Sequence, residues 1–182
     1  MSAQRGEQLE FRTLARDEIE LIWTIDRREM IERIYRLEGG ELRLEPHNFE
    51  VPGWPPDEAR TTTPGLYEAF DRGAIFFGAF DAGGLVGNSV LDSLWRGPHA
   101  DLLQLMRLHV SRDQRAHGVG SRLFEQARGE ARARGARGLY ISATPTENTV
   151  RFYQRRGSTL LETPDPELYA LEPQDIHLEC RT

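Results

Sequence analysis

The sequence contains no lysine, so all 23 of its basic side chains are arginine. It has one cysteine, Cys180, which excludes an internal disulfide and is typical of a protein in a reducing compartment. No apolar run approaches the ~18 residues that a membrane-spanning helix needs. The first residues also lack the apolar core of a signal peptide. We therefore expect a cytoplasmic protein that neither crosses a membrane nor depends on disulfides.

The length of 182 residues favours a single domain over residues 1–182, because a domain usually takes about 100–200 residues. A hydrophobic fraction of 38% and a charged fraction of 29% are typical of an ordinary folded domain. The chain has no internal repeat, no low-complexity segment and no linker long enough to separate two domains.

The net charge of −6 is the sum of two unlike parts. Residues 107–156 contain 11 arginines and four acidic residues, a balance of +7, and the remaining residues have a balance of −13. This asymmetry suggests an anionic partner for the basic segment and a cationic partner for the rest. The alternative is that many of these arginines only solvate the faces of helices.

The hydrophobic pattern alternates between strands and helices, which predicts an α/β fold. We expect strands over 9–14, 41–45, 74–80, 85–91, 102–110, 139–142, 159–161 and 176–180. We expect helices over 16–37 (with a break near residue 26), 63–71, 118–134 and 147–155, and a proline-rich loop over 46–56.

The most informative segment follows the strand that ends at Val110. Gly118 and Gly120 stand where the next helix begins, and glycine allows a ligand to approach the backbone closely. The first turn of a helix has backbone N–H groups without intrahelical acceptors and carries partial positive charge. The segment therefore predicts a phosphate site, with Arg115 adding a charged donor. Its backbone donors are His117, Gly118, Val119, Gly120 and Ser121.

Two common phosphate motifs are excluded. A Rossmann motif needs a third glycine where Leu123 stands and an acidic residue about 20 positions later, and the sequence has neither. A P-loop needs a lysine, and the chain has none.

The segment Arg115–Gly120 resembles the pyrophosphate motif of the GNAT superfamily of acetyl-CoA-dependent N-acetyltransferases. A second segment resembles the same superfamily, with Asn148, Phe152-Tyr153 and Gly157 at the expected spacing. The resemblance covers residues 73–162 and implies a mixed, mostly antiparallel central sheet flanked by helices. It also implies acetyl-CoA as co-substrate, an amine as acceptor and no metal.

The resemblance implies roles for individual residues. The pantetheine arm would lie along Leu108, His109 and Val110, and the N–H groups of Leu108 and Val110 would bind the thioester carbonyl. Asn148 would hydrogen-bond the pantetheine arm, and Tyr153 would protonate the departing thiolate. The plainer alternatives are that Tyr153 packs in the core and that Asn148 only starts a helix.

The general base is not evident from the sequence. Gln104 and Met106 stand where some relatives carry a glutamate or histidine, and neither side chain accepts a proton at pH 7. The other candidates are His109, Asp92, Asp101 and Glu38, each with a structural alternative.

The resemblance places the acceptor site in residues 15–70 and 163–175, and both segments are rich in acidic residues. We expect the acceptor to contact Glu29, Glu38 and Trp54 of the first segment, and Gln104 of the strand over 102–110. Further acidic residues are Asp165, Glu167, Glu172 and Asp175. Acidic and aromatic side chains favour a cationic small-molecule amine. The alternatives are a longer acyl-CoA and a non-catalytic CoA-binding module. We expect no nucleic-acid partner, since the chain as a whole is acidic. The sequence leaves open whether the protein forms a homodimer.

Overall fold

The computed structural model describes residues 9–182. Its strands are β1 (Glu10–Thr13), β2 (Glu29–Glu38), β3 (Glu41–Val51), β4 (Ile75–Asp81), β5 (Gly84–Arg96), β6 (Leu102–Val110), β7 (Gly138–Ala143), β8 (Thr159–Leu160) and β9 (Ile176–Arg181). Its helices are α1 (Glu58–Asp71), α2 (Val119–Ala133), α3 (Glu147–Gln154) and α4 (Pro166–Leu171), with 3₁₀ helices η1 (Arg16–Thr24) and η2 (Arg112–Gln114).

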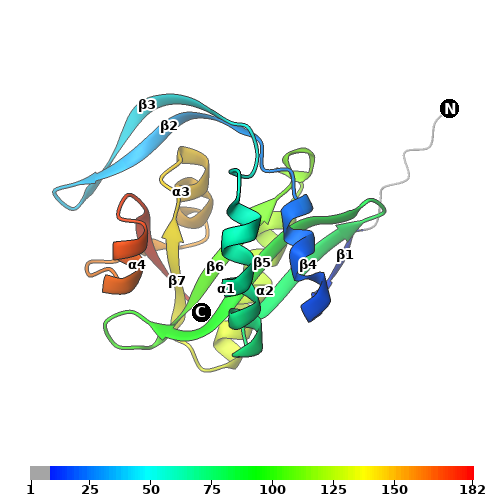
Figure 1. Cartoon of the computed structure of the whole chain (residues 1–182). Coiled ribbons are helices and arrows are strands. Elements are labelled where there is room, and N and C mark those ends of the chain that lie inside the picture. The colour runs from blue at the N-terminus through cyan, green and yellow to red at the C-terminus, as the bar shows by residue number, and fades with distance from the viewer. Residues whose placement is uncertain (1–8) are drawn as a thin grey trace.

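Seven strands form one sheet in the order β1-β4-β5-β6-β7-β9-β8. Only β6 and β7 are parallel, and every other neighbouring pair is antiparallel. Helices cover both faces of this sheet (Figure 1). The predicted fold class, a mixed and mostly antiparallel sheet flanked by helices, is confirmed.

The two faces of the sheet have separate hydrophobic cores. On one face α2 and α3 pack through the apolar stripe expected from the sequence, whose buried residues in α2 are Val119, Leu123, Phe124, Ala127 and Ala131. On the other face η1 and α1 cover β4 and β5, with Ile19, Ile22 and Leu66 buried. Further along that face Leu168 of α4 packs on Tyr140 of β7. This second face is therefore covered from two sides, by α1 and by α4.

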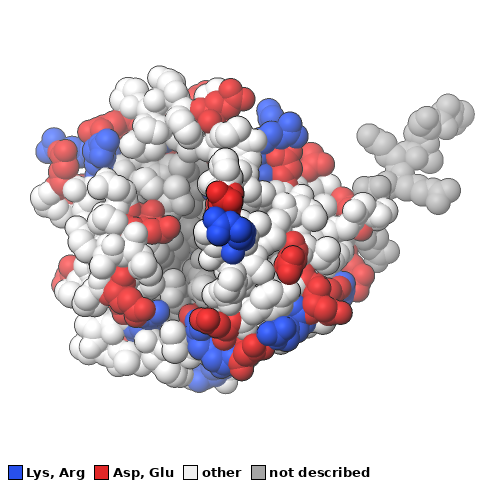
Figure 2. Space-filling model, viewed as in Figure 1, with Lys and Arg blue, Asp and Glu red and all other residues white. Residues whose placement is uncertain are grey.

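Strands β6 and β7 separate after a short paired segment. Their register extends only from Leu102 opposite Gly138 to Gln104 opposite Tyr140. A register shift between Leu105 and Arg107 on the β5 side bends β6 at the same level. The second halves of the two parallel strands are thus unpaired with each other. The space-filling view shows a groove at this place, between the α1 side and the α4 side of the molecule (Figure 2).

The predicted helix over 16–37 is wrong in its second half. Residues 29–38 form β2, which pairs with β3 in a two-stranded hairpin separate from the main sheet. Gly39 and Gly40 have φ values of 59° and 84°, which is the geometry of a two-residue hairpin turn. The predicted loop over 46–56 is also wrong over 46–51, because β3 runs to Val51.

The hairpin reaches over α3 (Figure 1). Tyr35 N–H donates to the Pro145 carbonyl at 2.7 Å, and Ile34 forms an isolated bridge with Thr146. Arg33 pairs with Glu147 in the first turn of α3 at 2.7 Å. These contacts fix β2 against the segment that carries Asn148.

Two other helices differ from the expectation. Helix α1 begins at Glu58, five residues before the expected start, and has Pro64 within it. Helix α4 lies in a segment expected to be a loop, and its N-terminus is capped by the Asp165 side chain, which accepts from two backbone N–H groups. Within residues 9–182 no helix is long and apolar enough to cross a membrane.

Candidate active site

The N-terminus of α2 offers free backbone donors. Gly118 is the N-cap with φ of 83°, and no side chain caps the helix there. The first turn of α2 contains no acidic residue. A Cβ added at Gly118 would meet nothing within 4 Å, so the loop is open on this side. Because these N–H groups are uncapped, this helix end can bind an anion, as the sequence predicts.

Gly120 serves packing as well as access. A Cβ at this position would lie 3.3 Å from the Phe152 ring and 3.5 Å from Val110 Cγ2. The absence of a side chain thus lets the first turn of α2 lie close to both β6 and α3. The glycine motif and the second motif are in direct contact through this residue.

The Arg115 guanidinium lies at the end of β6. Its Nε donates to the Val110 carbonyl at 3.1 Å, and its Nη1 donates to the Arg28 carbonyl at 3.3 Å. Its Nη1 also lies 3.7 Å from a carboxylate oxygen of Glu29. The side chain that the sequence predicts to bind phosphate therefore contacts the start of β2.

Arg156 is a second cation at this end of α2, and the sequence motifs assign it no role. Its guanidinium donates to the Ser121 hydroxyl and, at 2.6 Å, to the Phe152 carbonyl. It also lies over the Phe152 ring, 3.5 Å from the centroid. Burial lowers the pKa of Arg156. Its position just before Gly157 in the second motif was the signal that could have identified it.

The backbone of β6 presents two N–H groups to the gap beside β7. Ser111 N–H donates to the Val86 carbonyl of β5 at 2.8 Å. Backbone N–H groups point alternately to the two sides of a strand in an antiparallel pair. The N–H group of His109 therefore also points to β5, whereas those of Leu108 and Val110 point to the opposite edge of β6. β7 pairs with β6 only as far as Gln104. The N–H groups of Leu108 and Val110 therefore point into the space between the separated strands.

Helix α3 supplies Asn148 and Tyr153. Thr146 caps the helix, since its hydroxyl accepts from Thr149 N–H, so Asn148 is free of the capping role. Asn148 is exposed, and its amide donates to Glu29 at 3.2 Å. Tyr153 is buried against Phe124, with ring centroids 5.9 Å apart. Burial raises the pKa of Tyr153 well above its ordinary value, so the phenol is protonated at neutral pH.

Trp54 and Gln104 lie on the second face of the sheet, near the groove. The ring of Trp54 packs against that of His109 on β6, with centroids 5.0 Å apart, and its Nε1–H donates to the Ile25 carbonyl at 2.9 Å. Gln104 is buried in β6 where the two strands begin to separate. Arg107 lies between Gln104 and His109 on β6 and pairs with Glu58 of α1 at 3.5 Å. Burial lowers the pKa of Arg107.

The structure does not bring all four expected acceptor residues together. Glu38 lies at the hairpin tip, opposite Glu41, and pairs with Arg43 at 3.4 Å. Glu29 contacts Arg115 and Asn148, which are cofactor candidates, instead of Trp54 or Gln104. A hollow of about 230 Å³ lies between β2 and the first turn of α3, and Glu29 and Asn148 both line it.

None of the sequence candidates for the general base is suited to that role in the structure. Burial and three nearby arginines lower the pKa of His109 to about 3, so it is neutral at pH 7 and only weakly basic. Asp92 is buried in an ion pair with Arg72 at 2.9 Å. Asp101 pairs with Arg137 at 2.7 Å, and Glu38 lies at the hairpin tip.

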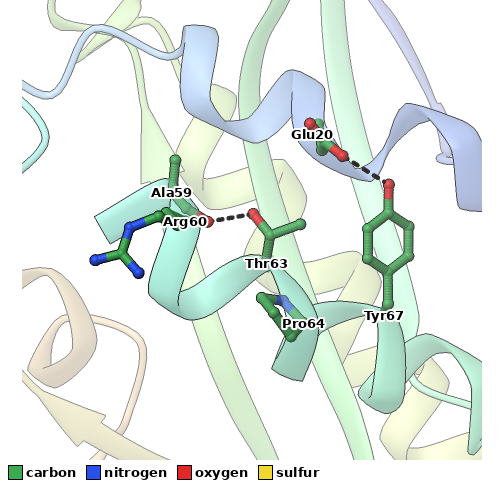
Figure 3. A pocket seen from close by; sticks show the side chains of 6 residues that line it. All are labelled: Glu20, Ala59, Arg60, Thr63, Pro64 and Tyr67. Atoms are coloured by element: carbon green, nitrogen blue, oxygen red, sulfur yellow. Dashed lines mark hydrogen bonds between the residues drawn. The ribbon is translucent and has the colours of Figure 1, made fainter. Parts of the chain in front are cut away.

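A larger hollow of about 510 Å³ lies on the outer surface, between η1 and α1 (Figure 3). There the Tyr67 hydroxyl donates to Glu20 at 3.0 Å, and Thr63 donates to the Ala59 carbonyl. Neither motif contributes a residue to its lining. In the part of the chain described, no group of three or more His, Cys, Asp or Glu could hold a metal ion.

Comparison with solved structures finds proteins of the same fold. The chain is similar in structure to a nourseothricin acetyltransferase, with a TM-score of 0.71 and 23% identity over 95% of this chain and 98% of the other. It is also similar to a protein from Bacillus anthracis assigned as a streptothricin acetyltransferase and solved with acetyl coenzyme A (TM-score 0.66, 18% identity, 98% and 99% covered). A third similar structure is the PaiA N-acetyltransferase from Thermoplasma acidophilum with coenzyme A (TM-score 0.63, 16% identity, 96% and 99% covered).

No curated protein matches the chain in sequence. The model of the acetyltransferase (GNAT) family matches residues 31–157, which is more than half of the chain and includes both motifs. The family expected from the two motifs is thereby confirmed: this chain belongs to the GNAT family of acetyltransferases.

Proposed function

We propose that this protein transfers the acetyl group of acetyl-CoA to the primary amine of a cationic small molecule. The observation that carries the proposal is the gap between β6 and β7, which leads from the groove to the uncapped end of α2. If acetyl-CoA lay in this gap, its thioester would meet the N–H groups of Leu108 and Val110, and its pyrophosphate would reach the N-terminus of α2.

The cofactor half of the site would hold acetyl-CoA through three sets of contacts. The backbone from His117 to Ser121, with Arg115 beside it, would bind the pyrophosphate through charge-assisted hydrogen bonds. Asn148 would hydrogen-bond the pantetheine arm once it leaves Glu29. Two of the similar structures described above were solved with acetyl-CoA or CoA.

The reaction would be a direct attack of the amine on the thioester carbonyl. Holding both reactants in the gap replaces a collision in solution and contributes up to about 7–11 kcal/mol to the barrier reduction. The Leu108 and Val110 N–H groups would stabilise the negative charge that develops on the carbonyl oxygen. Tyr153, which burial keeps protonated, would donate its proton to the departing sulfur.

The acceptor half of the site favours a cationic amine. Acidic side chains lie on both sides of the groove (Figure 2). Glu58 begins α1 and is shared by Arg27 and Arg107, and Glu172 follows α4. The Arg27 guanidinium lies over the Trp54 ring, 4.6 Å from its centroid, so a cationic amine would have to displace Arg27 to stack there. Two structural neighbours are named for the acetylation of nourseothricin and streptothricin, which supports an antibiotic-like amine.

A panel of amines with acetyl-CoA, followed by release of the free thiol, tests this function. We expect turnover with polyamine-like or antibiotic-like amines, and product mass increased by one acetyl group. Best turnover with neutral or acidic amines would refute the cationic acceptor. Binding of CoA without turnover on any amine would favour a non-catalytic module, and equal use of longer acyl-CoA would refute acetyl specificity.

A further inference from the structure

Asp175 lies against β7 just beyond the point where β6 turns away. The Ser142 hydroxyl donates to Asp175 Oδ2 at 3.0 Å, although the two residues are 33 positions apart in the chain. Ser142 lies two residues after Tyr140, the last β7 residue paired with β6, so both side chains are on the same face of the sheet. Asp175 therefore stands at the unpaired part of β7, beside the gap.

A second carboxylate lies next to Asp175. Asp175 N–H donates to the Glu172 carbonyl at 3.1 Å, in a turn between α4 and β9. Both residues lie between the end of α4 and the start of β9, so the turn is on the α4 side of the groove. The two acidic residues thus belong to the α4 wall of the groove.

A buried histidine lies beside the same turn. His177 is only 4% exposed, and its Nδ1 shares a hydrogen bond with the Tyr140 hydroxyl at 2.7 Å. The other side of the ring lies against the Glu172 backbone. His177 therefore links the turn that carries both carboxylates to Tyr140 of β7.

The electrostatics of this wall suit proton transfer. Burial and the Glu172 carboxylate raise the pKa of Asp175 to about 7, against the opposing effect of the Ser142 hydrogen bond. The charge of Asp175 in turn raises the pKa of Tyr153 on α3. Burial lowers the pKa of His177, so this ring is neutral at pH 7. Asp175 can thus accept a proton near neutral pH, and its charge acts on Tyr153, the residue predicted to be the general acid.

We propose that Asp175 is the general base that takes a proton from the ammonium group of the acceptor, with Glu172 as the neighbouring carboxylate that attracts this cation. The inference rests on the amine acetylation proposed above. It fills the role for which Gln104 and Met106 are chemically unsuited. Burial and nearby arginines make His109 only weakly basic, and Asp92 and Asp101 are held in ion pairs.

The proton balance closes without a further reactant. Asp175 accepts one proton from the ammonium and later releases it to water, and the free amine forms the C–N bond. As the C–S bond breaks, the Tyr153 proton goes to sulfur, and the second proton of the attacking nitrogen returns to the Tyr153 oxygen. Neutralising Asp175 removes a negative charge near Tyr153, so the first transfer makes Tyr153 a stronger acid for the second.

The test is the pH dependence of kcat/KM for the best amine of the panel. In the wild-type protein we expect activity to fall as the pH drops through about 7, because Asp175 must be ionised. Asp175→Asn should lose this inflection and, at pH 7, about 10²-fold or more of kcat/KM. Its remaining activity should rise with the fraction of free amine in solution. The Kd for CoA should stay unchanged.

Two milder variants keep the test valid if Asp175→Asn fails to fold. Glu172→Gln should move the inflection to lower pH, and Ser142→Ala should move it to higher pH, because these groups shift the Asp175 pKa in opposite directions. Glu130→Gln, on α2 and paired with Arg134 at 2.8 Å, is the control and should leave the profile in place.

The outcomes separate the two proposals. If the wild-type protein acetylates an amine and Asp175→Asn keeps both its rate and its inflection, Asp175 is not the base. Asp175 is also excluded as the base if Glu172→Gln and Ser142→Ala leave the inflection where it was. If the wild-type protein releases no thiol with any amine, the proposed function fails and this inference fails with it.

Discussion

Replacing Glu29 with glutamine distinguishes two roles for this residue. The sequence predicts that Glu29 contacts the acceptor, whereas in the structure its carboxylate lies 3.7 Å from Arg115 Nη1 and accepts from Asn148 at 3.2 Å. The carboxylate thus occupies two groups that acetyl-CoA would need. We expect Glu29→Gln to strengthen CoA binding.

The magnitude follows from the exposure of the pair. The Arg115 and Glu29 side chains are 34% and 25% exposed, so water screens much of their attraction. Ion pairs at the surface contribute about 0.2–1 kcal/mol. Relieving a competition of about 1 kcal/mol lowers Kd about fivefold.

Titration calorimetry with CoA measures this effect directly. At low ionic strength we expect the Kd of Glu29→Gln to be about fivefold below that of the wild type. The difference should shrink in high salt, because ions screen exposed charges. Glu32→Gln is the matched control, since Glu32 lines the same hollow and lies on the same strand.

A different pattern would refute the reasoning. If the Kd for CoA is unchanged or higher in Glu29→Gln, the carboxylate does not compete with the cofactor. If the amine KM rises at the same time, Glu29 acts on the acceptor, as the sequence predicts.

Three further variants test other parts of the structure. Tyr153→Phe should lower kcat at least about tenfold with an unchanged CoA Kd, because the ring keeps its packing against Phe124; an unchanged kcat would remove Tyr153 from the acid role. Gly118→Ala should cost about 1–2 kcal/mol in urea unfolding, because its φ of 83° is left-handed while nothing lies within 4 Å; a neutral result would contradict this backbone geometry. Leu123→Ala should cost about 2–5 kcal/mol in the same assay, because Leu123 is fully buried in α2, and a smaller loss would show that the core collapses around the gap.

The prediction of a helix that extends to residue 37 was wrong for a local reason. Residues 29–38 contain Glu, Arg, Met and Leu, which favour helices, and their apolar members also fit a 3.6-residue period. In the structure the segment is extended because it pairs with β3, and Arg36 forms a cross-strand ion pair with Glu45 at 2.7 Å. The Gly39-Gly40 pair was the available sign of a two-residue turn.

The uncapped start of α2 after β6 was predictable because its determinants are consecutive in the chain. A strand, two glycines and an amphipathic helix specify a helix end with free N–H groups, and β6 and α2 have the expected positions. The separation of β6 from β7 is different, since it depends on pairing between segments more than 30 residues apart. No local pattern marks where that pairing stops.

The sequence by itself determined the family, the fold class and the uncapped start of α2, because neighbouring residues create these features through backbone geometry. Only the tertiary structure decided which partners the acidic residues have. It placed Glu29 beside Arg115 and Asp175 beside Ser142, contacts that join residues 86 and 33 positions apart. The basicity of a carboxylate depends on its burial and on the charges around it, and folding sets both.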